Sequence, residues 1–195
     1  SDKKSPKKFN PQDKNWVEIW NDVLMQYNKD AKGNYNEAKQ KNIDTGMGVE
    51  RTLAILQGFE DNYVTEMWKP MINQIEKLSK RKYDESKEIT KSMRIIADHI
   101  KASIFIINDG IVPGNLEQGY VLRRLIRRAL RHLRLLGVDL LKIDSTVEIA
   151  KPIMKIYKDY NLKEKIIFEE LKKEEDRFQK TLDKGLKEFE KMSSD

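Results

Sequence analysis

The chain has 195 residues, of which 36% are charged and 38% apolar, with a formal net charge of +6 and no cysteine. The absence of cysteine excludes disulfides, iron–sulfur clusters and cysteine-bound zinc, and two histidines leave little for any other metal site. No apolar run approaches the ~20 residues of a membrane span, so we expect a cytoplasmic protein. The high charge and modest apolar content are typical of helical proteins, and the positive net charge favours an anionic partner, most commonly nucleic acid.

The first 58 residues combine a lead-in with a short region of predicted strands. Residues 1–15 are basic, contain proline and lack periodicity, so we expect a disordered arm. Residues 16–28, WVEIWNDVLMQYN, are rich in β-branched, aromatic and large apolar side chains, which predicts a buried strand. The turn signal DAKGNYN, centred on Gly33, predicts a second short strand that ends near Ile43. The following GVERTLAILQG predicts a helix that closes at Gly58.

Helical patterns dominate the chain from residue 59 onward. The segment YVTEMWKPMINQIEKLSK predicts a helix that is interrupted or kinked near Pro70. Residues 87–109 predict a helix with one buried face, because large apolar residues recur every three or four positions. These residues are Met93, Ile96, Ile100, Ile104 and Ile107. Residues 109–115, DGIVPGN, predict a loop because of their glycines and proline.

Residues 119–137, GYVLRRLIRRALRHLRLLG, carry six arginines and no acidic residue. At ~100° per residue the arginines of the predicted helix share an arc of roughly 140°. They are Arg123, Arg124, Arg127, Arg128, Arg131 and Arg134. The opposite side is apolar and is expected to pack on the protein; it consists of Val121, Leu122, Leu125, Ile126, Ala129, Leu133 and Leu136.

The composition of this helix favours a nucleic-acid surface. Ordinary solvated helices mix Glu with Lys, because pairs four residues apart stabilise by ~0.3 kcal/mol each. This helix forgoes every such pair and uses only arginine, whose planar fork engages phosphate oxygens bidentately. The alternative is a solvated basic stripe that pairs with acidic residues of a neighbouring helix, such as those of residues 169–176.

Asn115 lies just before the arginine helix, in a Pro-Gly-Asn turn. Asparagine is common in turns and near helix starts, and its spacing alone favours that ordinary role. In the functional alternative the loop presents the amide to a base edge, since asparagine offers a donor and an acceptor at a fixed distance.

Two further helices are predicted near the C-terminus. Residues 146–158 predict a helix that Pro152 can kink. Residues 163–192 carry large apolar residues at roughly heptad spacing amid dense charge, which predicts a long exposed helix or half of a helical hairpin. The heptad residues are Phe168, Leu171, Phe178, Leu182 and Phe189.

Several long motifs, in the same order, resemble the alanyl-tRNA synthetase family within the class II aminoacyl-tRNA synthetases. NIDTGMGVER looks like motif three, and EIWNDVLMQYN resembles the strand that precedes it. The longest match, residues 94–132, is similar to the family's tRNA-recognition domain, and EEDRFQKTLDKG matches a later helix. The resemblance covers about residues 16–137 closely and the rest loosely.

The resemblance implies a mainly α fold with two regions after the lead-in. Residues 16–58 would be a short antiparallel β remnant of the class II catalytic domain, comprising its last strands and the motif-three helix. Residues 59–195 would be a helical tRNA-recognition bundle, truncated at its C-terminal end.

The resemblance also implies roles for single residues of the catalytic remnant. Arg51 matches the motif-three arginine that contacts ATP phosphates, and Gly48 is assigned to ATP binding with it. Asp44 matches the carboxylate that holds the α-ammonium group of the amino acid. The positions that match the small amino-acid pocket are Asn21 and Val23, with Gly46 and Gly48 keeping room there.

In the recognition domain, Asn115 matches the asparagine that reads the G·U wobble pair at the third position of the acceptor stem. The arginine helix matches the element that grips the backbone of that stem. The implied partners are therefore the tRNA-Ala acceptor stem and, for the parent alanine–tRNA ligase, alanine, ATP and Mg²⁺. The alternative is a non-catalytic RNA-binding module without base specificity. DNA is not expected, because the 109–115 loop is longer than the turn of a helix-turn-helix.

Some family features have no counterpart in the sequence. Nothing before Trp16 resembles motif one, or motif two with the arginine that orients the amino acid and ATP. A DTYGFP-like segment and the zinc-binding editing domain are also missing. We therefore expect an internal fragment that cannot activate alanine alone, binds no cofactor tightly and holds no metal.

Overall fold

The computed structural model describes residues 8–13 and 16–193, and it divides the chain into two compact units, Ser1–Thr65 and Glu66–Asp195. Residues 1–7, 14 and 15 of the predicted lead-in lie outside the described residues. The described part of the lead-in forms a turn, in which the backbone N–H of Asp13 donates to the carbonyl of Asn10 over 3.0 Å.

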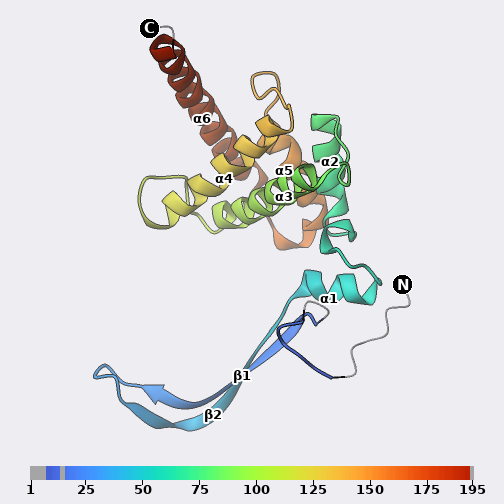
Figure 1. Cartoon of the computed structure of the whole chain (residues 1–195). Coiled ribbons are helices and arrows are strands. Elements are labelled where there is room, and N and C mark those ends of the chain that lie inside the picture. The colour runs from blue at the N-terminus through green and yellow to red at the C-terminus, as the bar shows by residue number, and fades with distance from the viewer. Residues whose placement is uncertain (1–7, 14–15, 194–195) are drawn as a thin grey trace. The chain divides into compact units, whose positions relative to one another are not determined.

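The first unit is built on a β-hairpin (Figure 1). Strand β1, Trp20–Lys29, pairs antiparallel with β2, Tyr35–Met47. In the connecting turn, the Asp30 carboxylate accepts the backbone N–H groups of Lys32 and Asn34, each over 2.9 Å. Gly33 lies at a φ of +90°, in the region that favours glycine, so the predicted turn is confirmed.

The second strand is longer than predicted. The expected end near Ile43 is wrong, because β1 continues to pair with β2 up to the Trp20–Met47 position. A short helix, α1, follows at Val49–Leu56, and a 3₁₀ turn, η1, at Asn62–Val64. Gly58, at a φ of +72°, ends α1 in the left-handed conformation, as predicted.

The prediction of a buried first strand is wrong. Trp20 is 59% exposed and Leu24 is 75% exposed, and both strands are exposed along nearly their whole length. The composition is that of a buried strand, but a strand is buried only where another layer covers its face. Among the described residues, no third strand pairs with this hairpin.

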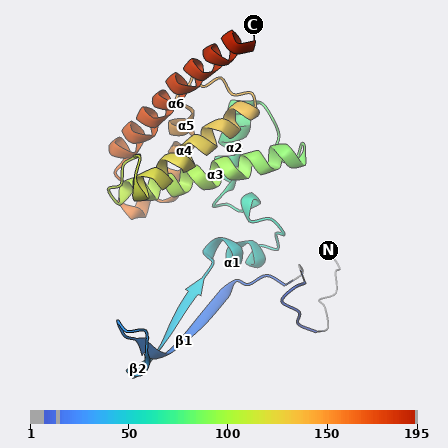
Figure 2. The same ribbon diagram turned by 60° about the vertical axis from the view of Figure 1, so that its left-hand side comes forward.

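The second unit is a helical bundle (Figures 1 and 2). Its elements are α2 (Lys69–Ser79), α3 (Lys87–Asn108), α4 (Glu117–Leu135), α5 (Ser145–Ile156), η2 (Lys158–Tyr160) and α6 (Glu164–Ser193). Helices α3 and α4 lie side by side in both views, and α6 contacts α3, α4 and α5. No helix in the described ranges is both long and apolar enough to cross a bilayer.

The core of the bundle lies between α3 and α4. The predicted buried face of α3 is confirmed, since all five of its apolar residues are at most 1% exposed. From α4, Leu122, Ile126, Leu130 and Leu133 are fully buried. The two helices run antiparallel, because Ser92 near the start of α3 meets His132 near the end of α4 over 3.1 Å.

Pro70 lies at the beginning of a helix, where an interruption or a kink within a longer helix was expected. It occupies the first turn of α2, and the preceding segment forms η1 and turns. A proline there removes no intrahelical hydrogen bond, because the first four N–H groups of a helix have no partner within it. Pro152 does lie inside α5. The predicted C-terminal helix is confirmed as α6; Phe189 of its heptad pattern lies outside the described side chains.

Glu175 of α6 caps the start of α5. Its carboxylate, 1% exposed, accepts the backbone N–H of Ser145 over 3.1 Å, the N–H of Thr146 over 3.0 Å and the Thr146 hydroxyl over 2.6 Å. Burial raises the pKa of Glu175, against these hydrogen bonds, which favour the charged form. Because the side chain of Asp144, the N-cap residue, makes no capping bond, α6 supplies the cap.

Candidate nucleic-acid interface

Helix α4 presents its arginines on the side away from the core. The apolar side is buried largely as predicted, at Leu122, Ile126, Ala129, Leu133 and Leu136. There are three differences: Leu130 is also buried, Leu125 is only half-buried, and Val121 is 52% exposed. On a helix Val121 lies ~120° from the centre of the buried residues, at the edge of the arginine arc, so packing on α3 leaves it in solvent.

Most of the arginine face carries uncompensated charge. The exposed arginines are Arg124, Arg128, Arg131 and Arg134. None of them has a carboxylate partner among the residues that the structure describes. Arg124 stacks over the ring of Tyr120, 5.6 Å from its centroid, which leaves the charge in place. These side chains are therefore available to a polyanion.

Arg127 is the exception, and its predicted outward orientation is wrong. Its Nε donates to Oε1 of Glu174 on α6 over 2.6 Å, and Glu174 is 1% exposed. Arg177 approaches the other oxygen of the same carboxylate at 3.7 Å. The alternative of pairing with the acidic residues of 169–176 thus holds for this one arginine. Spacing along α4 could not reveal it, because it depends on which helix packs beside α4.

The loop before α4 is held against the first turn of that helix. The N–H of Gly114 donates to the carbonyl of Gly119 over 2.9 Å. A Cβ at Gly119 would lie 2.8 Å from the carbonyl oxygen of Val112, so only glycine allows this approach. The loop therefore carries the exposed Asn115 in a defined place relative to α4.

Asn115 and Arg123, predicted separately from the sequence, meet in the structure. The Arg123 guanidinium donates to Oδ1 of Asn115. Because the amide oxygen is engaged, the amide NH₂ is the group left to donate to an acceptor. Arg123 is half-buried and also lies over Tyr120, at 5.9 Å from the ring centroid. The arrangement fixes one hydrogen-bond donor beside a row of cations.

The region around α4 has a positive potential. Burial lowers the pKa of His132, and the charges of Arg128, Arg131 and Lys91 lower it further. The neutral ring therefore predominates at neutral pH and adds no charge of its own.

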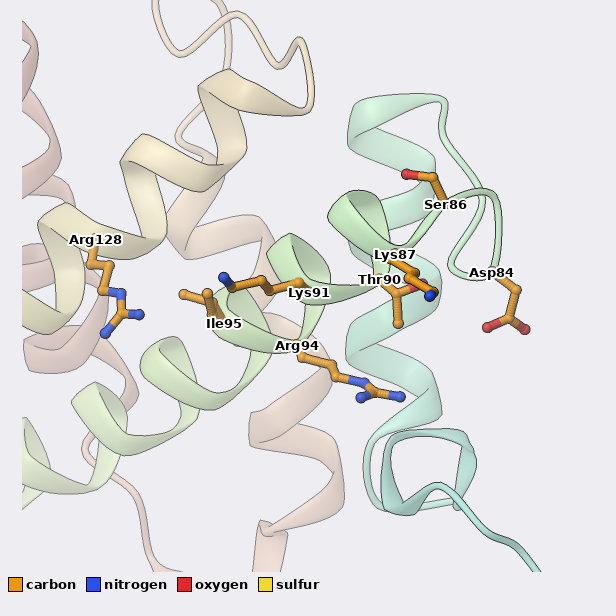
Figure 3. A pocket seen from close by; sticks show the side chains of 8 residues that line it. All are labelled: Asp84, Ser86, Lys87, Thr90, Lys91, Arg94, Ile95 and Arg128. Atoms are coloured by element: carbon orange, nitrogen blue, oxygen red, sulfur yellow. The ribbon is translucent and has the colours of Figure 1, made fainter.

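Sequence reasoning missed a groove beside this face. It is open, has a volume of about 800 Å³ and lies between the start of α3 and the middle of α4 (Figure 3). Its lining residues are Asp84, Ser86, Lys87, Thr90, Lys91, Arg94, Ile95 and Arg128. The signal was present, since Lys87, Lys91 and Arg94 are spaced four and three residues apart and share one face of a helix.

The residues assigned to the amino-acid pocket lie together on the hairpin. Asn21 pairs directly with Gly46, and Val23 with Asp44. Since opposite residues share a face and alternate residues return to it, all four occupy one face of the ladder. That face is exposed in this chain, with Val23 at 50%.

Arg51 and Gly48 lie at the start of α1. The Arg51 guanidinium donates to the carbonyl of Glu18 over 3.1 Å, and the N–H of Gly48 donates to the carbonyl of Ile19 over 2.9 Å. Both bonds tie the start of α1 to the segment that leads into β1. No three His, Asp or Glu side chains in the described part of the chain converge as a metal site requires.

The family model described as tRNA synthetases class II (A) matches residues 1–195. The chain is 48% identical over 180 residues to an alanine–tRNA ligase of Borrelia hermsii, covering 91% of this chain and 30% of that protein. It is 45% identical over 181 residues to the alanine–tRNA ligase of Borreliella afzelii, with the same shares covered. For the Pediococcus pentosaceus alanine–tRNA ligase the identity is 44% over 172 residues, covering 88% of this chain and 20% of that protein. The chain thus spans less than a third of the length of these relatives.

Proposed function

The chain belongs to the class II (A) family of tRNA synthetases, and from that membership we propose that it is the part of an alanine–tRNA ligase that binds the acceptor stem of tRNA-Ala. The observation that carries the proposal is the Asn115 amide, held by Arg123 at the head of a helix whose exposed arginines lack carboxylate partners in the described chain. This arrangement supports a division of labour in which phosphate contacts position the RNA and one amide reads a base pair.

The geometry of double-helical RNA suits this surface. Its minor groove is wide and shallow and displays base edges, whereas its major groove is too narrow for side chains. The exposed arginines of α4 would engage phosphate oxygens bidentately. The amide NH₂ of Asn115 donates to an acceptor on the minor-groove edge of the third base pair, and the contact between Gly114 and Gly119 keeps the loop in place for it.

For the parent enzyme we propose alanine activation with ATP and transfer to tRNA. Asp44 would hold the α-ammonium group of alanine, and Asn21, Val23 and Gly46 would line its pocket. Their common face on the β1–β2 ladder supports this assignment. Arg51, with Gly48 at the same helix start, would bind ATP phosphates.

We expect that the purified chain does not catalyse alanine-dependent pyrophosphate exchange. The physical reason is that the face carrying Asp44 and Val23 is open to water, so nothing excludes solvent from a bound adenylate. The measurement is incorporation of labelled pyrophosphate into ATP with and without alanine. Alanine-dependent exchange above the level without enzyme would contradict the expectation.

The proposed base readout is tested with two acceptor-stem hairpins that differ only in a G·U or G·C third pair. We expect the unsubstituted chain to prefer G·U by about tenfold, the size of one good base contact. Asn115→Ala should abolish the preference and leave the salt dependence of binding unchanged, because no phosphate contact is lost.

Gln118→Ala is the matched control, since it removes another exposed amide beside the same loop and should leave the preference intact. Equal binding of both hairpins by the unsubstituted chain would contradict base readout. It would instead favour an RNA-binding module without base specificity.

A further inference from the structure

The groove between α3 and α4 carries charge that the proposed readout does not use. Lys87, Lys91 and Arg94 enter it from α3, and Arg128 enters it from α4. In Figure 3, Lys91 extends toward the side of Arg128, and Ile95 lies between them. The groove therefore joins two helices of the bundle through side chains of one sign.

The polar groups of the groove differ in how they are engaged. Arg94 is held by Tyr83, whose hydroxyl accepts from its Nε over 2.5 Å. Lys87 and Lys91 are exposed and have no carboxylate partner in the described residues. Asp84 is the single carboxylate in the lining, whereas Lys87, Lys91 and Arg128 have no carboxylate partner among the described residues. The surplus positive charge calls for an anionic ligand.

The hydroxyls of the groove already have partners. Ser86 Oγ accepts the N–H of Ile89 over 3.2 Å as the N-cap of α3, and the Thr90 hydroxyl donates to the carbonyl of Tyr83. Both hydroxyl groups therefore contribute hydrogen bonds to the fold. Ligand recognition in this groove therefore depends on the lysines and arginines, whose positive charge suits a phosphate group more than a base edge.

The groove is continuous with the arginine face. Arg128, which lines the groove, is also one of the exposed arginines of α4. Glu117 and Arg128 are eleven residues apart in α4, which corresponds to ~16 Å along the helix axis. The groove thus lies well away from the loop that carries Asn115, at a distance that one RNA stem can bridge.

We propose that this groove binds phosphates of the RNA backbone at a second place, so that the bound RNA crosses α3 as well as following α4. The inference rests on the proposed function, because the same RNA occupies both places. An open groove lined by an apolar side chain, Ile95, and by exposed lysines suits a passing backbone, since enclosed sites are the usual form for small ligands.

The test compares two double variants that remove the same charge. Lys87→Ala/Lys91→Ala empties the groove of its unpaired lysines. The matched control is Lys77→Ala/Lys155→Ala, which removes two exposed lysines from another groove, between α2 and α5. Binding of the G·U hairpin is measured by fluorescence anisotropy at salt concentrations from about 0.05 to about 0.3 M. Counterion release makes the logarithm of the affinity fall linearly with the logarithm of the salt concentration.

We expect the groove variant to lower the slope of log affinity against log salt by about 1.4 to 1.8, and the affinity at 0.1 M by about 25- to 60-fold. The control should keep the slope of the unsubstituted chain. Equal slopes for the groove variant and the unsubstituted chain would overturn the inference and leave the proposed function standing. If the unsubstituted chain binds no hairpin, the proposed function fails and the inference fails with it.

Discussion

Replacing Arg124, Arg131 and Arg134 together with alanine is expected to lower the affinity for the acceptor-stem hairpin by about 100- to 500-fold at 0.1 M salt. Each of these exposed side chains lacks a carboxylate partner in the described chain, so each can neutralise one phosphate and release its counterion. The slope of log affinity against log salt should fall by about 2.1 to 2.7. The measurement is the same anisotropy titration over a series of salt concentrations.

A charge-matched control separates the arginine face from net charge. Lys77→Ala/Lys155→Ala/Lys158→Ala removes three exposed cations that lie off α4, in α2, α5 and η2. If binding follows the arginine face, this variant keeps most of the affinity and the original slope. A loss as large as that of the arginine variant would mean that overall charge alone drives binding, which contradicts the proposed surface.

Arg127 is left out of that variant for a structural reason. Its removal would leave Glu174, 1% exposed, without its 2.6 Å partner, and would present an unpaired carboxylate beside the RNA surface. Any loss of RNA affinity would then combine repulsion, local unfolding and a lost contact. The exposed arginines report on phosphate contacts alone.

Glu175→Ala is expected to lower the free energy of unfolding by about 3 kcal/mol, the sum of several lost hydrogen bonds to buried donors. The substitution strands the N–H groups of Ser145 and Thr146 and the Thr146 hydroxyl, all of which the carboxylate accepts. Both residues are fully buried, so water cannot replace the acceptor without opening the junction of α5 and α6. The measurement is urea denaturation followed by circular dichroism at 222 nm, near the ordinary helical minimum.

The control for this prediction is Glu169→Ala, which removes an exposed carboxylate from the same helix and should change the free energy of unfolding by no more than ~0.5 kcal/mol. A similarly small change for Glu175→Ala would show that the cap is dispensable. The stability of the α5–α6 junction would then have to come from apolar packing, at residues such as Ile149 and Leu171.

Local patterns were sufficient to predict most of the helices. The buried face of α3, the glycine that ends α1 and the long α6 depend on spacings of a few residues, which a sequence displays directly. Pro70 was misread because a proline interrupts a helix in its interior and is accommodated in its first turn; the sequence does not mark which position it holds.

The candidate site could be predicted only in part. The spacing of the arginines on α4 and the composition of the loop before it predicted the segment in which the exposed arginines and Asn115 lie. Direct contact between Asn115 and Arg123 was not predicted, although they are eight residues apart, because it depends on how the loop folds back onto Gly119. Lys91 and Arg128 belong to different helices, and their common groove follows from the antiparallel packing of α3 on α4.

The sequence alone was enough to assign the family resemblance, the helical class and a basic surface on α4, because these follow from residue types and short-range periodicity. Tertiary structure decided which arginines of α4 remain available to an anionic ligand. Arg127 and Arg124 have the same chemistry and lie on the same arc, yet α6 buries Glu174 against the first and leaves the second in solvent. The hairpin gives the same lesson, since strands with an apolar composition remain exposed where no second layer covers them. Burial and pairing depend on neighbours that are distant in the sequence, and spacing along one helix or strand does not reveal them.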